Sequence, residues 1–498
     1  MTTPLVEVCA VSKAFGGSRA LDGVDFDAQA GEIHALLGQN GAGKSTLIKI
    51  LAGIYRADAG TVRFSGVAVD PIQRALPVSF VHQELGLVDD MTVAENIALV
   101  SGYPTRRHLI SWRDVRANAK RVMEVMGVDL DTNRLASTLS MAERSLVAIG
   151  RGLAVDARLF VFDEPTAALA ANDVARLFEV LRRLRTHGIG VVYVTHRLDE
   201  VFQLADRVTV LRDGRRAGAA CVNEITPARL IALIVGRCLS EVFPSPPAPT
   251  NSPVLKVIDL ETPHAGPVTF TLHMGEILGL VGLRGAGHDN IGRAIFGDAP
   301  LLGGSVIVAG ADSGVPVPLG MIRRGLGFVS SKRGEEALAE SLSTRENLFL
   351  NPAIRGNAAT TLLRPHLERR RASGVLRRSD VRPPDPSMAV VKLSGGNQQK
   401  LVLARWMELN SRLLVLEEPT LGIDIGAKAE IYARLMNRLA DGGAVILVSS
   451  DFEEVARVCH RALVFNRGRI TAELPRHELS QSTIMGLASS AALENGTA

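Results

Sequence analysis

Residues 38–46 read Gly38-Gln39-Asn40-Gly41-Ala42-Gly43-Lys44-Ser45-Thr46, which is the pattern G-x-x-x-x-G-K-[ST] of a phosphate-binding loop. An apolar run at 33–37 precedes it and a helix-like run at 46–52 follows it, which is the context this motif requires. The glycines allow successive backbone N–H groups to face phosphate oxygens at a helix N-terminus. Lys44 is expected to reach the β- and γ-phosphates, and the Ser45 hydroxyl is expected to bind Mg²⁺.

This loop occurs once, whereas nearly everything around it occurs twice. Three pairs of segments share an offset of 254 residues, as from Ser140 to Ser394, which chance does not explain. A fourth pair has an offset of 244, as from Gly31 to Gly275, so about ten residues were inserted between the segments. The pairs are 139–153 with 393–407, 159–170 with 413–424, 191–201 with 445–455, and 31–46 with 275–290. The sequence therefore predicts one diverged domain written twice.

The length of the chain agrees with such a repeat, because 498 residues exceed an ordinary single core. The halves meet at FPSPPAPTNSP, residues 243–253, which suits neither a helix nor a central strand. A short, stiff linker of this kind keeps neighbouring domains close together. We therefore predict domains at 1–242 and 254–498, joined by the proline-rich linker 243–253.

Within each half, strand-like runs alternate with helical stretches, which predicts an α/β fold. Segments 159–162 and 190–195 are almost wholly apolar, as expected for strands buried on both faces of a parallel sheet. Between residues 101 and 133 the pattern becomes helical and charged, which indicates an inserted helical subdomain. The phosphate loop, the carboxylates after residue 162 and the segment VTH at 194–196 then lie at the carboxyl ends of adjacent strands, where open α/β sheets bind ligands.

Composition and charge exclude several classes of protein. No window approaches about 18 uninterrupted apolar residues, and we expect neither a membrane span nor a secretion signal. The four cysteines are scattered without C-x-x-C spacing, which is typical of reduced thiols in the cytoplasm. A net charge of +4 does not require a nucleic-acid partner. The basic run at 369–371 with 377–378 lacks interleaved aromatic residues, so we expect a solvated helix face there.

The motifs LSGGNQQ at 393–399 and DEPT at 163–166, in this order after the phosphate loop, resemble the ATP-binding subunit of an ABC transporter. The fusion of two such halves, with GLRGAG at 282–287, resembles the ATPases of ribose-, galactose- and xylose-type monosaccharide importers. This resemblance implies two tandem P-loop NTPase domains. Each would have a mainly parallel sheet core, an antiparallel β portion and an inserted helical subdomain.

The resemblance also implies roles for residues of the first half. Asp163 would anchor Mg²⁺, and Glu164 would polarise the attacking water. Gln83 is similar to the glutamine that contacts both Mg²⁺ and the membrane partner, and His196 is similar to the histidine that reads the γ-phosphate. Phe15 is a candidate for stacking on adenine, although a position in the core suits it nearly as well.

In this family each ATP lies between the phosphate loop of one domain and the signature segment of the other. The pocket of the first phosphate loop would therefore be completed from the second half by Ser394, Gly395, Gly396 and Asn397 of the signature and by Asp424. Together with Lys44, Ser45, Asp163, Glu164 and His196, every element of this pocket is intact.

The reciprocal pocket has lost its chemical groups. His288 replaces the lysine, and Asp289, a carboxylate, replaces the hydroxyl residue that would face Mg²⁺. The further replacements are Glu417 for the aspartate, Ser450 for the histidine, Ser331 for the glutamine, Met141 and Ala142 for the signature glycines, and Ala170 for the counterpart of Asp424. Because each lost phosphate-clamping group costs several kcal/mol of transition-state stabilisation, we expect one hydrolytic site and one structural or regulatory site.

The predicted function is an ATP-hydrolysing, energy-coupling subunit that uses ATP and Mg²⁺ and imports a monosaccharide or related polyol. The resemblance implies two integral membrane permease subunits, an extracytoplasmic solute-binding protein and a peripheral position on the cytoplasmic face of the inner membrane. A nucleoside importer ATPase is an alternative with the same fused architecture. A ribosome-associated tandem ATPase fits less well, because its domains usually flank a long charged linker and keep two complete signatures.

Overall fold

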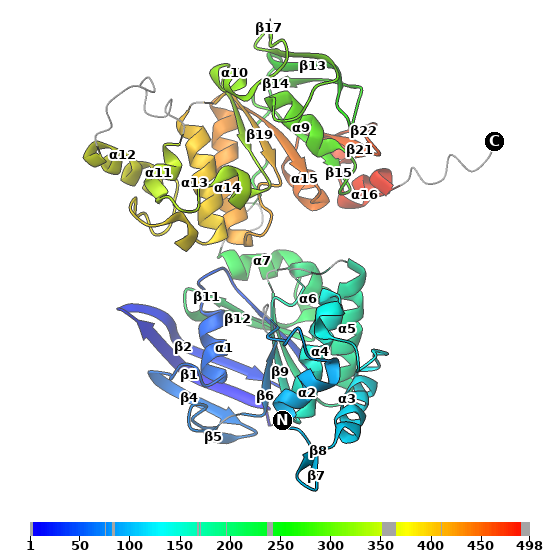
Figure 1. Cartoon of the computed structure of the whole chain (residues 1–498). Coiled ribbons are helices and arrows are strands. Elements are labelled where there is room, and N and C mark those ends of the chain that lie inside the picture. The colour runs from blue at the N-terminus through cyan, green and yellow to red at the C-terminus, as the bar shows by residue number, and fades with distance from the viewer. Residues whose placement is uncertain are drawn as a thin grey trace, which may run out of the picture. The chain divides into compact units, whose positions relative to one another are not determined.

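The computed structural model describes residues 3–74, 76–81, 85–166, 169, 171–195, 197–236, 243–350, 365–409 and 411–489, without the side chains of 171 and 172. The chain forms two compact units, Met1–Cys238 and Leu239–Ala498, which Figure 1 colours from blue to green and from green to red. The predicted domain limits at 242 and 254 stay predictions.

The main sheet of the first unit has the strand order β12-β11-β3-β10-β9-β6. Its strands are β3 Ile33–Leu37, β6 Val78–Val81, β9 Leu159–Asp163, β10 Gly190–Val194, β11 Arg207–Arg212 and β12 Arg215–Cys221. All neighbours pair in parallel except β11 with β12. Every residue of β3 and β10 is buried, so the unbroken apolar runs do form strands covered on both faces. The predicted α/β class is confirmed.

A second, antiparallel sheet of the first unit packs over helix α1 (Lys44–Leu51). Its order is β2-β1-β4-β5, with β1 Val6–Phe15, β2 Ser18–Ala28, β4 Ala59–Phe64 and β5 Val67–Val69. One core cluster joins Leu47 of α1 to Val6 on the antiparallel sheet and Leu36 on the main sheet. Helix α1 therefore lies between the two sheets, as Figure 1 shows.

Helices cover the opposite face of the main sheet. They are α2 Val93–Ser101, α3 Trp112–Met126, α4 Met141–Ala154, α5 Ala171–Thr186 and α6 Leu198–Leu204, and α7 Pro227–Val235 follows β12. The predicted helical subdomain at 101–133 contains α3 and also a small hairpin, β7 Thr105–Arg106 with β8 Leu109–Ile110. The sequence did not predict this hairpin, because its strands are only two residues long and both are exposed.

The second unit repeats this topology, which confirms the tandem fold. Its main sheet has the order β18-β19-β20-β15-β21-β22, and its antiparallel sheet has the order β14-β13-β16-β17. The strands are β13 Pro253–Glu261, β14 Val268–His273, β15 Ile277–Gly282, β16 Gly303–Val308, β17 Ala311–Asp312, β18 Leu326–Val329, β19 Leu413–Glu417, β20 Ala444–Ser449, β21 Arg461–Asn466 and β22 Arg469–Pro475. The helices are α9 His288–Phe296, α10 Pro318–Arg323, α11 Thr344–Leu348, α12 Pro365–Arg378, α13 Gly395–Glu408, α14 Ile425–Ala440, α15 Phe452–Val458 and α16 Gln481–Ser489.

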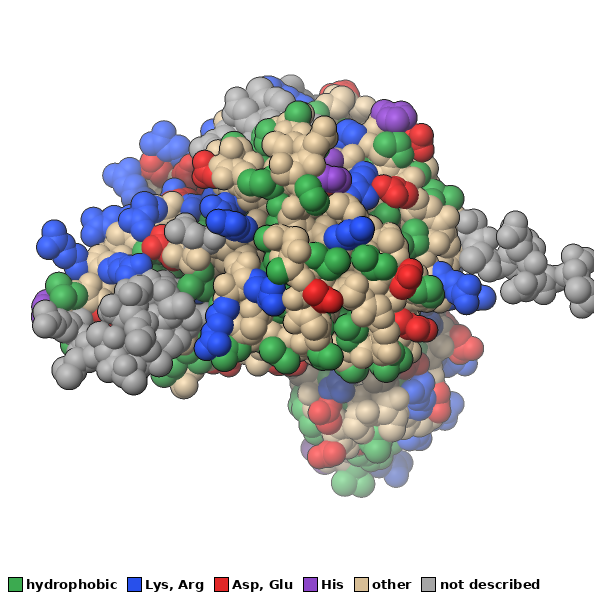
Figure 2. Space-filling view, turned by 90° about the horizontal axis from the view of Figure 1, so that it is seen from above, with side chains coloured by type: hydrophobic (Ala, Val, Ile, Leu, Met, Phe, Trp, Pro, Cys, Tyr) green, Lys and Arg blue, Asp and Glu red, His purple; other side chains and the backbone are tan. Residues whose placement is uncertain are grey.

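The basic run of the second half lies on α12, as expected. The arginines at 369–371 and 377–378 are exposed, whereas Ala372, Val375 and Leu376 are buried. Figure 2 shows Lys and Arg side chains gathered on the side of the second unit where α12 lies. Among the described residues, no helix is long and apolar enough to cross a membrane.

The linker segment packs on the second unit. The Phe243 ring lies 5.7 Å from the Tyr432 ring, and the Arg457 guanidinium lies 5.2 Å from the Phe243 ring. Further along, His460 Nε2 lies 2.7 Å from the carbonyl oxygen of Pro247. These contacts fix the proline-rich segment along one edge of the second main sheet.

Candidate functional site

The phosphate-binding loop joins β3 to α1 through a backbone that is crowded at two glycines. A Cβ atom on Gly38 would lie 2.3 Å from the Leu211 carbonyl oxygen. Gly43, the N-cap of α1, has a φ of 104°, and a Cβ atom there would lie 2.7 Å from the Ala20 carbonyl oxygen. Because both obstacles are backbone atoms, only glycine fits at these positions.

Lys44 and the N-terminus of α1 bring positive charge to this loop. Lys44 is buried, and its Nζ donates to the carbonyl oxygens of Gly38 (2.7 Å) and Gln39 (3.1 Å). The fully described first turn of α1 carries no acidic residue, so the helix N-terminus is free to attract an anion. The other predicted loop residues are Asn40, Gly41 and Ser45, which are exposed, Thr46, which is half-buried, and Ala42, which is buried. This arrangement can bind phosphate groups.

Asp163 is the last residue of β9 and Glu164 follows it, and β10 separates β9 from the strand that leads to the phosphate loop. Asp163 pairs in register with Val194 of β10, and β10 in turn lies next to β3. Glu164 has a φ of 51°, and its backbone N–H donates to the Val194 carbonyl oxygen at 2.9 Å. A left-handed glutamate is uncommon and persists only where its surroundings fix it, and such residues concentrate at functional sites. Lys44, Asp163 and Glu164 therefore lie at the same edge of the main sheet, at the ends of strands that β10 separates, and their roles stay predictions.

Glu200, which the sequence analysis missed, fixes the turn that follows these carboxylates. This buried side chain accepts hydrogen bonds from Thr166 Oγ1 (2.7 Å), Tyr193 Oη (2.7 Å) and Thr195 Oγ1 (3.0 Å). It therefore ties the DEPT turn to the end of β10. The available signal was the repeat itself, because a glutamate recurs at position 454 of the second half.

Three of the predicted residues, Gln83, Ala170 and His196, lie outside the described residues. Phe15 lies at the surface with 43% of its area exposed, and its ring packs edge-on against Tyr55 at 5.1 Å. The alternative that Phe15 belongs to the core is therefore wrong, and its ring is accessible for stacking.

The signature helices of the two halves differ in charge at their N-termini. In α13 the first turn, described throughout, has no acidic residue, and Asn397 Nδ2 donates to Ser394 Oγ at 2.8 Å. In α4, by contrast, Glu143 accepts a hydrogen bond from the Ser140 backbone N–H at 2.8 Å. A carboxylate in the first turn disfavours an anion, and here Glu143 also pairs with Arg134 at 2.8 Å, so the two signature helices differ in the charges at their N-termini.

The intact signature is also sterically defined. A Cβ atom on Gly396 would lie 2.9 Å from the Cβ of Ala427, whereas one on Gly395 would lie 3.0 Å from Arg333 Nη2. Asp424 is the N-cap of α14, and its Oδ1 accepts from the Ala427 backbone N–H at 2.9 Å. Asp424 therefore has a structural role in addition to the predicted one.

The second-half phosphate loop keeps its backbone and loses its cation. His288 is the first residue of α9, in the place of Lys44, and only 3% of it is exposed. Burial lowers the pKa of His288, although the Asp289 charge opposes this change. Its Nδ1 has no hydrogen-bond partner among the described residues. A neutral, buried imidazole provides no fixed charge for a phosphate.

An internal cation holds the carboxylate that replaces the metal-binding aspartate. Arg293 Nη2 donates to Glu417 Oε2 (2.8 Å), Glu336 Oε2 (2.9 Å) and Ser330 Oγ (3.2 Å). Glu417 is 2% exposed, and burial raises its pKa, which the Arg293 guanidinium opposes. The sequence analysis missed Arg293, although the offset of 244 pairs it with Lys49 of the first half.

The second-half glutamate is also committed to internal contacts. Glu418 repeats the left-handed backbone of Glu164, with a φ of 40° and a hydrogen bond from its N–H to the Val448 carbonyl oxygen at 2.8 Å. Its Oε1, however, accepts from the Ser450 backbone N–H at 2.6 Å. A carboxylate engaged in this way is a poor general base for a water molecule.

The oxygen donors of the first half fit Mg²⁺, which takes one or two protein oxygens, phosphate oxygens and several waters. Ser45 provides a hydroxyl at the loop, and Asp163 provides a half-buried carboxylate at the neighbouring strand end. Among the described residues, no three His, Cys, Asp or Glu side chains form a metal cluster. A metal that binds together with its nucleotide does not need such a cluster, because the phosphates supply part of its ligands.

Comparison with known proteins agrees with this geometry. A family model described as ABC transporter matches residues 21–167 and 265–421. The chain belongs to the ABC transporter family. It is 41% identical to the ribose import ATP-binding protein RbsA 1 of Rubrobacter xylanophilus, with 97% of this chain and 98% of that protein covered. This membership confirms that the chain binds and hydrolyses ATP, as predicted.

Other relatives have similar names. A putative ribose/galactose/methyl galactoside import ATP-binding protein 1 of Burkholderia lata is 40% identical, over 97% of this chain and 96% of that protein. Among solved structures, the ATP-binding cassette MJ1267 of an ABC transporter is 26% identical to this chain, with a TM-score of 0.42. The matched region covers 47% of this chain and 98% of MJ1267.

Glu454, the second-half counterpart of Glu200, makes the stability of the second unit depend on pH. Burial raises the pKa of Glu454 to about 7, although Lys428 and a hydrogen bond from Thr420 oppose this rise. Because the folded state then holds this proton more tightly, stability present below about pH 4.5 is lost as the pH rises to about 7.

We expect Glu454→Gln to remove the loss of stability that the second unit shows as the pH rises. Between pH 4.5 and 7.5, the stability of the variant relative to the native chain should rise by roughly 3 kcal/mol. Unfolding of the second unit can be followed by its single tryptophan, Trp406, in a Trp112→Phe background. Glu453→Gln, at an exposed neighbour, is the control, and a similar pH trend in both variants would contradict the assignment.

The Arg293–Glu417 ion pair gives a second stability prediction. Arg293→Met leaves a buried carboxylate unpaired and should destabilise the second unit by about 3 kcal/mol. The double variant Arg293→Met/Glu417→Met should recover most of this loss, as measured by urea unfolding with the same Trp406 signal. Lys49→Met, the matched change in the first unit, should leave that signal unchanged. Additive losses in the double variant would show that the pair is not coupled.

Proposed function

We propose that this chain is the ATP-hydrolysing, energy-coupling subunit of a bacterial importer for a monosaccharide or a related polyol. The observation that carries this proposal is that Lys44, Asp163 and Glu164 lie at the carboxyl ends of β3 and β9, at one edge of the same parallel sheet. The choice of cargo is supported by bacterial relatives that are named ribose or ribose/galactose import ATP-binding proteins.

In the proposed reaction, the loop amides and Lys44 bind the β- and γ-phosphates of ATP. Ser45 and Asp163 hold Mg²⁺, which supplies charge neutralisation when it is bound. Glu164 accepts a proton from the attacking water, in a carboxylate position that its strained backbone fixes. Phe15 stacks on adenine, while Gln83 and His196 complete the contacts around the γ-phosphate, as in the family.

The second half contributes its signature to this same site. As in the family, Ser394, Gly395, Gly396 and Asn397 would approach the phosphates from the opposite side, and Asp424 would lie beside them. The charge at the two signature helices supports this pairing, because α13 lacks the first-turn carboxylate that α4 carries. Binding of ATP then draws the two domains together, and hydrolysis with phosphate release lets them part.

The reciprocal site is proposed to be silent in hydrolysis. Neutral His288 replaces a phosphate-binding cation, and Arg293 occupies the Glu417 carboxylate. Each of these losses alone removes several kcal/mol of transition-state stabilisation, so together they leave a structural or regulatory site.

Transport requires partners that provide a path through the membrane. We assign this path to two integral membrane permease subunits, with this chain bound peripherally on the cytoplasmic face of the inner membrane. An extracytoplasmic solute-binding protein would deliver the sugar. The support for these partners is the family and the word import in the names of the relatives.

The asymmetry of the two sites predicts unequal effects of matched substitutions. Glu164→Gln should lower the ATPase rate at least about a hundredfold, because it removes the general base, while ATP binding is retained. Glu418→Gln, the matched change in the other half, should leave most of the rate. Both can be measured by phosphate release from the purified transporter, with ATP binding as the folding control. Equal losses in the two variants would defeat the one-site proposal.

Capture of the chain from gently solubilised native membranes tests the importer itself. We expect a multi-span permease to copurify, with or without a solute-binding protein whose ligand then identifies the cargo. A binding protein specific for nucleosides would transfer the assignment to nucleoside import. Ribosomal proteins without any permease would overturn the importer.

A further inference from the structure

In the second unit, the edge where the strands of the main sheet begin is covered by the linker. His460 Nδ1 accepts from the Ile277 backbone N–H at 2.9 Å, and Nε2 of the same ring meets the Pro247 carbonyl oxygen at 2.7 Å. A Cβ atom on Gly275 would lie 3.5 Å from the Cα of Pro249. An extended, proline-rich segment is therefore bound at this edge by one imidazole and by close backbone packing.

The first unit has the same edge with the same internal bonds. Asp206 corresponds to His460, and its Oδ2 accepts from the Ile33 backbone N–H at 2.9 Å, as His460 Nδ1 does from Ile277. The ion pair Arg207–Glu32 recurs as Arg461–Glu276. The two edges are thus counterparts, and they can be compared residue by residue.

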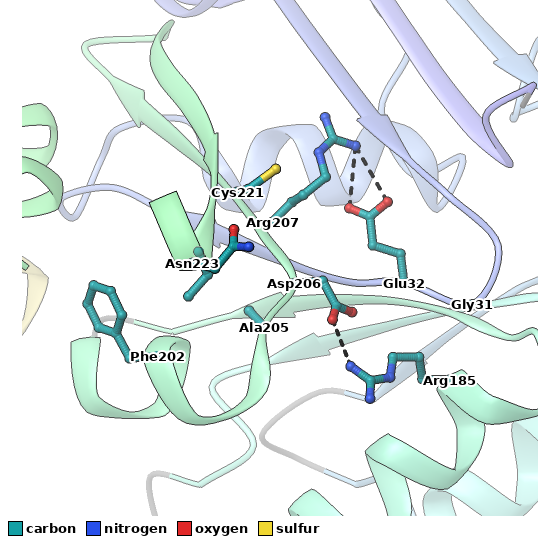
Figure 3. A pocket seen from close by; sticks show the side chains of 10 residues that line it. Gly31, Glu32, Arg185, Phe202, Ala205, Asp206, Arg207, Cys221 and Asn223 are labelled. Carbon is teal, nitrogen blue, oxygen red and sulfur yellow. Dashed lines mark hydrogen bonds and ion pairs between the residues drawn. The ribbon is translucent and has the colours of Figure 1, made fainter. Parts of the chain in front are cut away.

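Where the second unit holds its linker, the first unit has an open pocket of about 830 Å³. Figure 3 shows its lining, with Arg185 directed at Asp206 and Arg207 directed at Glu32. Six of the lining side chains are Glu32, Arg185, Phe202, Asp206, Arg207 and Asn223. We call this pocket the strand-start groove.

The described residues of the first unit include no counterpart of the covering segment. Val6 pairs with Ala28, and Leu255 pairs with Leu272, so the two strand pairs align Val6 with Leu255. Thr3 then corresponds to Ser252. Within the part of the chain that the structure describes, no segment covers this edge of the first unit as the linker covers the edge of the second, and the groove is open.

We propose that the strand-start groove binds an extended, proline-containing segment of a second polypeptide. In the second unit, the same edge binds such a segment through a hydrogen bond between His460 and a backbone carbonyl oxygen of that segment, which supports this proposal. In the first unit a different residue provides a donor at this edge: Arg185 Nη1 donates to Asp206 Oδ1 at 2.7 Å, while 35% of the Arg185 side chain stays exposed. Its remaining N–H groups can donate to a carbonyl oxygen of the incoming chain.

The charges of the groove favour a peptide over an anionic ligand. Arg207 is paired with Asp27 and Glu32, and Arg185 is paired with Asp206, so neither guanidinium is an uncompensated charge. The half-buried Phe202 ring adds an apolar surface, which suits the rigid, low-entropy backbone of a proline-rich segment.

An occupant of this groove would not compete with ATP. Glu32 precedes β3, whereas the phosphate-binding loop comes after β3, so the two sites lie at opposite ends of one strand. A partner bound at the strand-start groove can tether or regulate the ATPase while nucleotide exchanges freely. This inference does not depend on the identity of the transported solute.

A labelled synthetic peptide with the sequence of residues 243–253 is a direct probe, because it is the segment that fills the equivalent edge. We expect it to bind the full chain with one peptide per chain, as measured by fluorescence anisotropy, while a scrambled peptide of the same composition does not. Arg185→Glu should abolish this binding.

A gain of affinity separates the proposal from a folding defect. The double variant Arg185→Leu/Asp206→His copies the pair Leu439 and His460 of the second unit. It should bind the peptide about two- to tenfold more tightly, since the imidazole can donate to the Pro247 carbonyl as His460 does. Absence of peptide binding to both the native chain and this variant would overturn the proposal. Binding that neither set of substitutions alters would place the peptide elsewhere and would also overturn it.

Discussion

The parallel pairing of β9, β10 and β3 is the constraint on which the functional site depends. Each strand is buried, and the order β9-β10-β3 places the end of β9 two strands away from the phosphate loop. A backbone hydrogen bond from Glu164 to Val194 then fixes the first residue after β9 against the neighbouring strand. The same pairing of β19, β20 and β15 builds an equivalent frame in the second unit, so the two halves differ in their side chains and not in this frame.

The two halves separate backbone geometry from side-chain chemistry. Glu164 and Glu418 have the same left-handed backbone and the same hydrogen bond to the neighbouring strand. They differ in the residue at the corresponding position after the neighbouring strand, which is Ser450 in the second half and His196 in the first. The strained turn therefore belongs to the fold, whereas its use in hydrolysis depends on the groups brought against it.

Much of this arrangement could be predicted from the sequence, because the phosphate loop, the DEPT turn and the repeat are local patterns. The buried strands could be inferred from their unbroken apolar runs. Alignment of the two halves also showed that His288 takes the place of Lys44 in the second half. The roles of Glu200 and Arg293 could not be inferred, since their partners lie up to 124 residues away in the chain. The open strand-start groove also escaped prediction, because a proline-rich linker gives no sign of where it packs.

The two halves differ in the cation that neutralises the carboxylate at the end of β9 or β19. At the first site the positive charge opposite Asp163 is proposed to come from Mg²⁺, which enters and leaves with the nucleotide. At the second site the charge opposite Glu417 is Arg293, which is covalently part of α9 and cannot leave. Arg293 also donates to Glu336 and Ser330, so in the second unit the protein itself neutralises the Glu417 carboxylate without a bound metal ion.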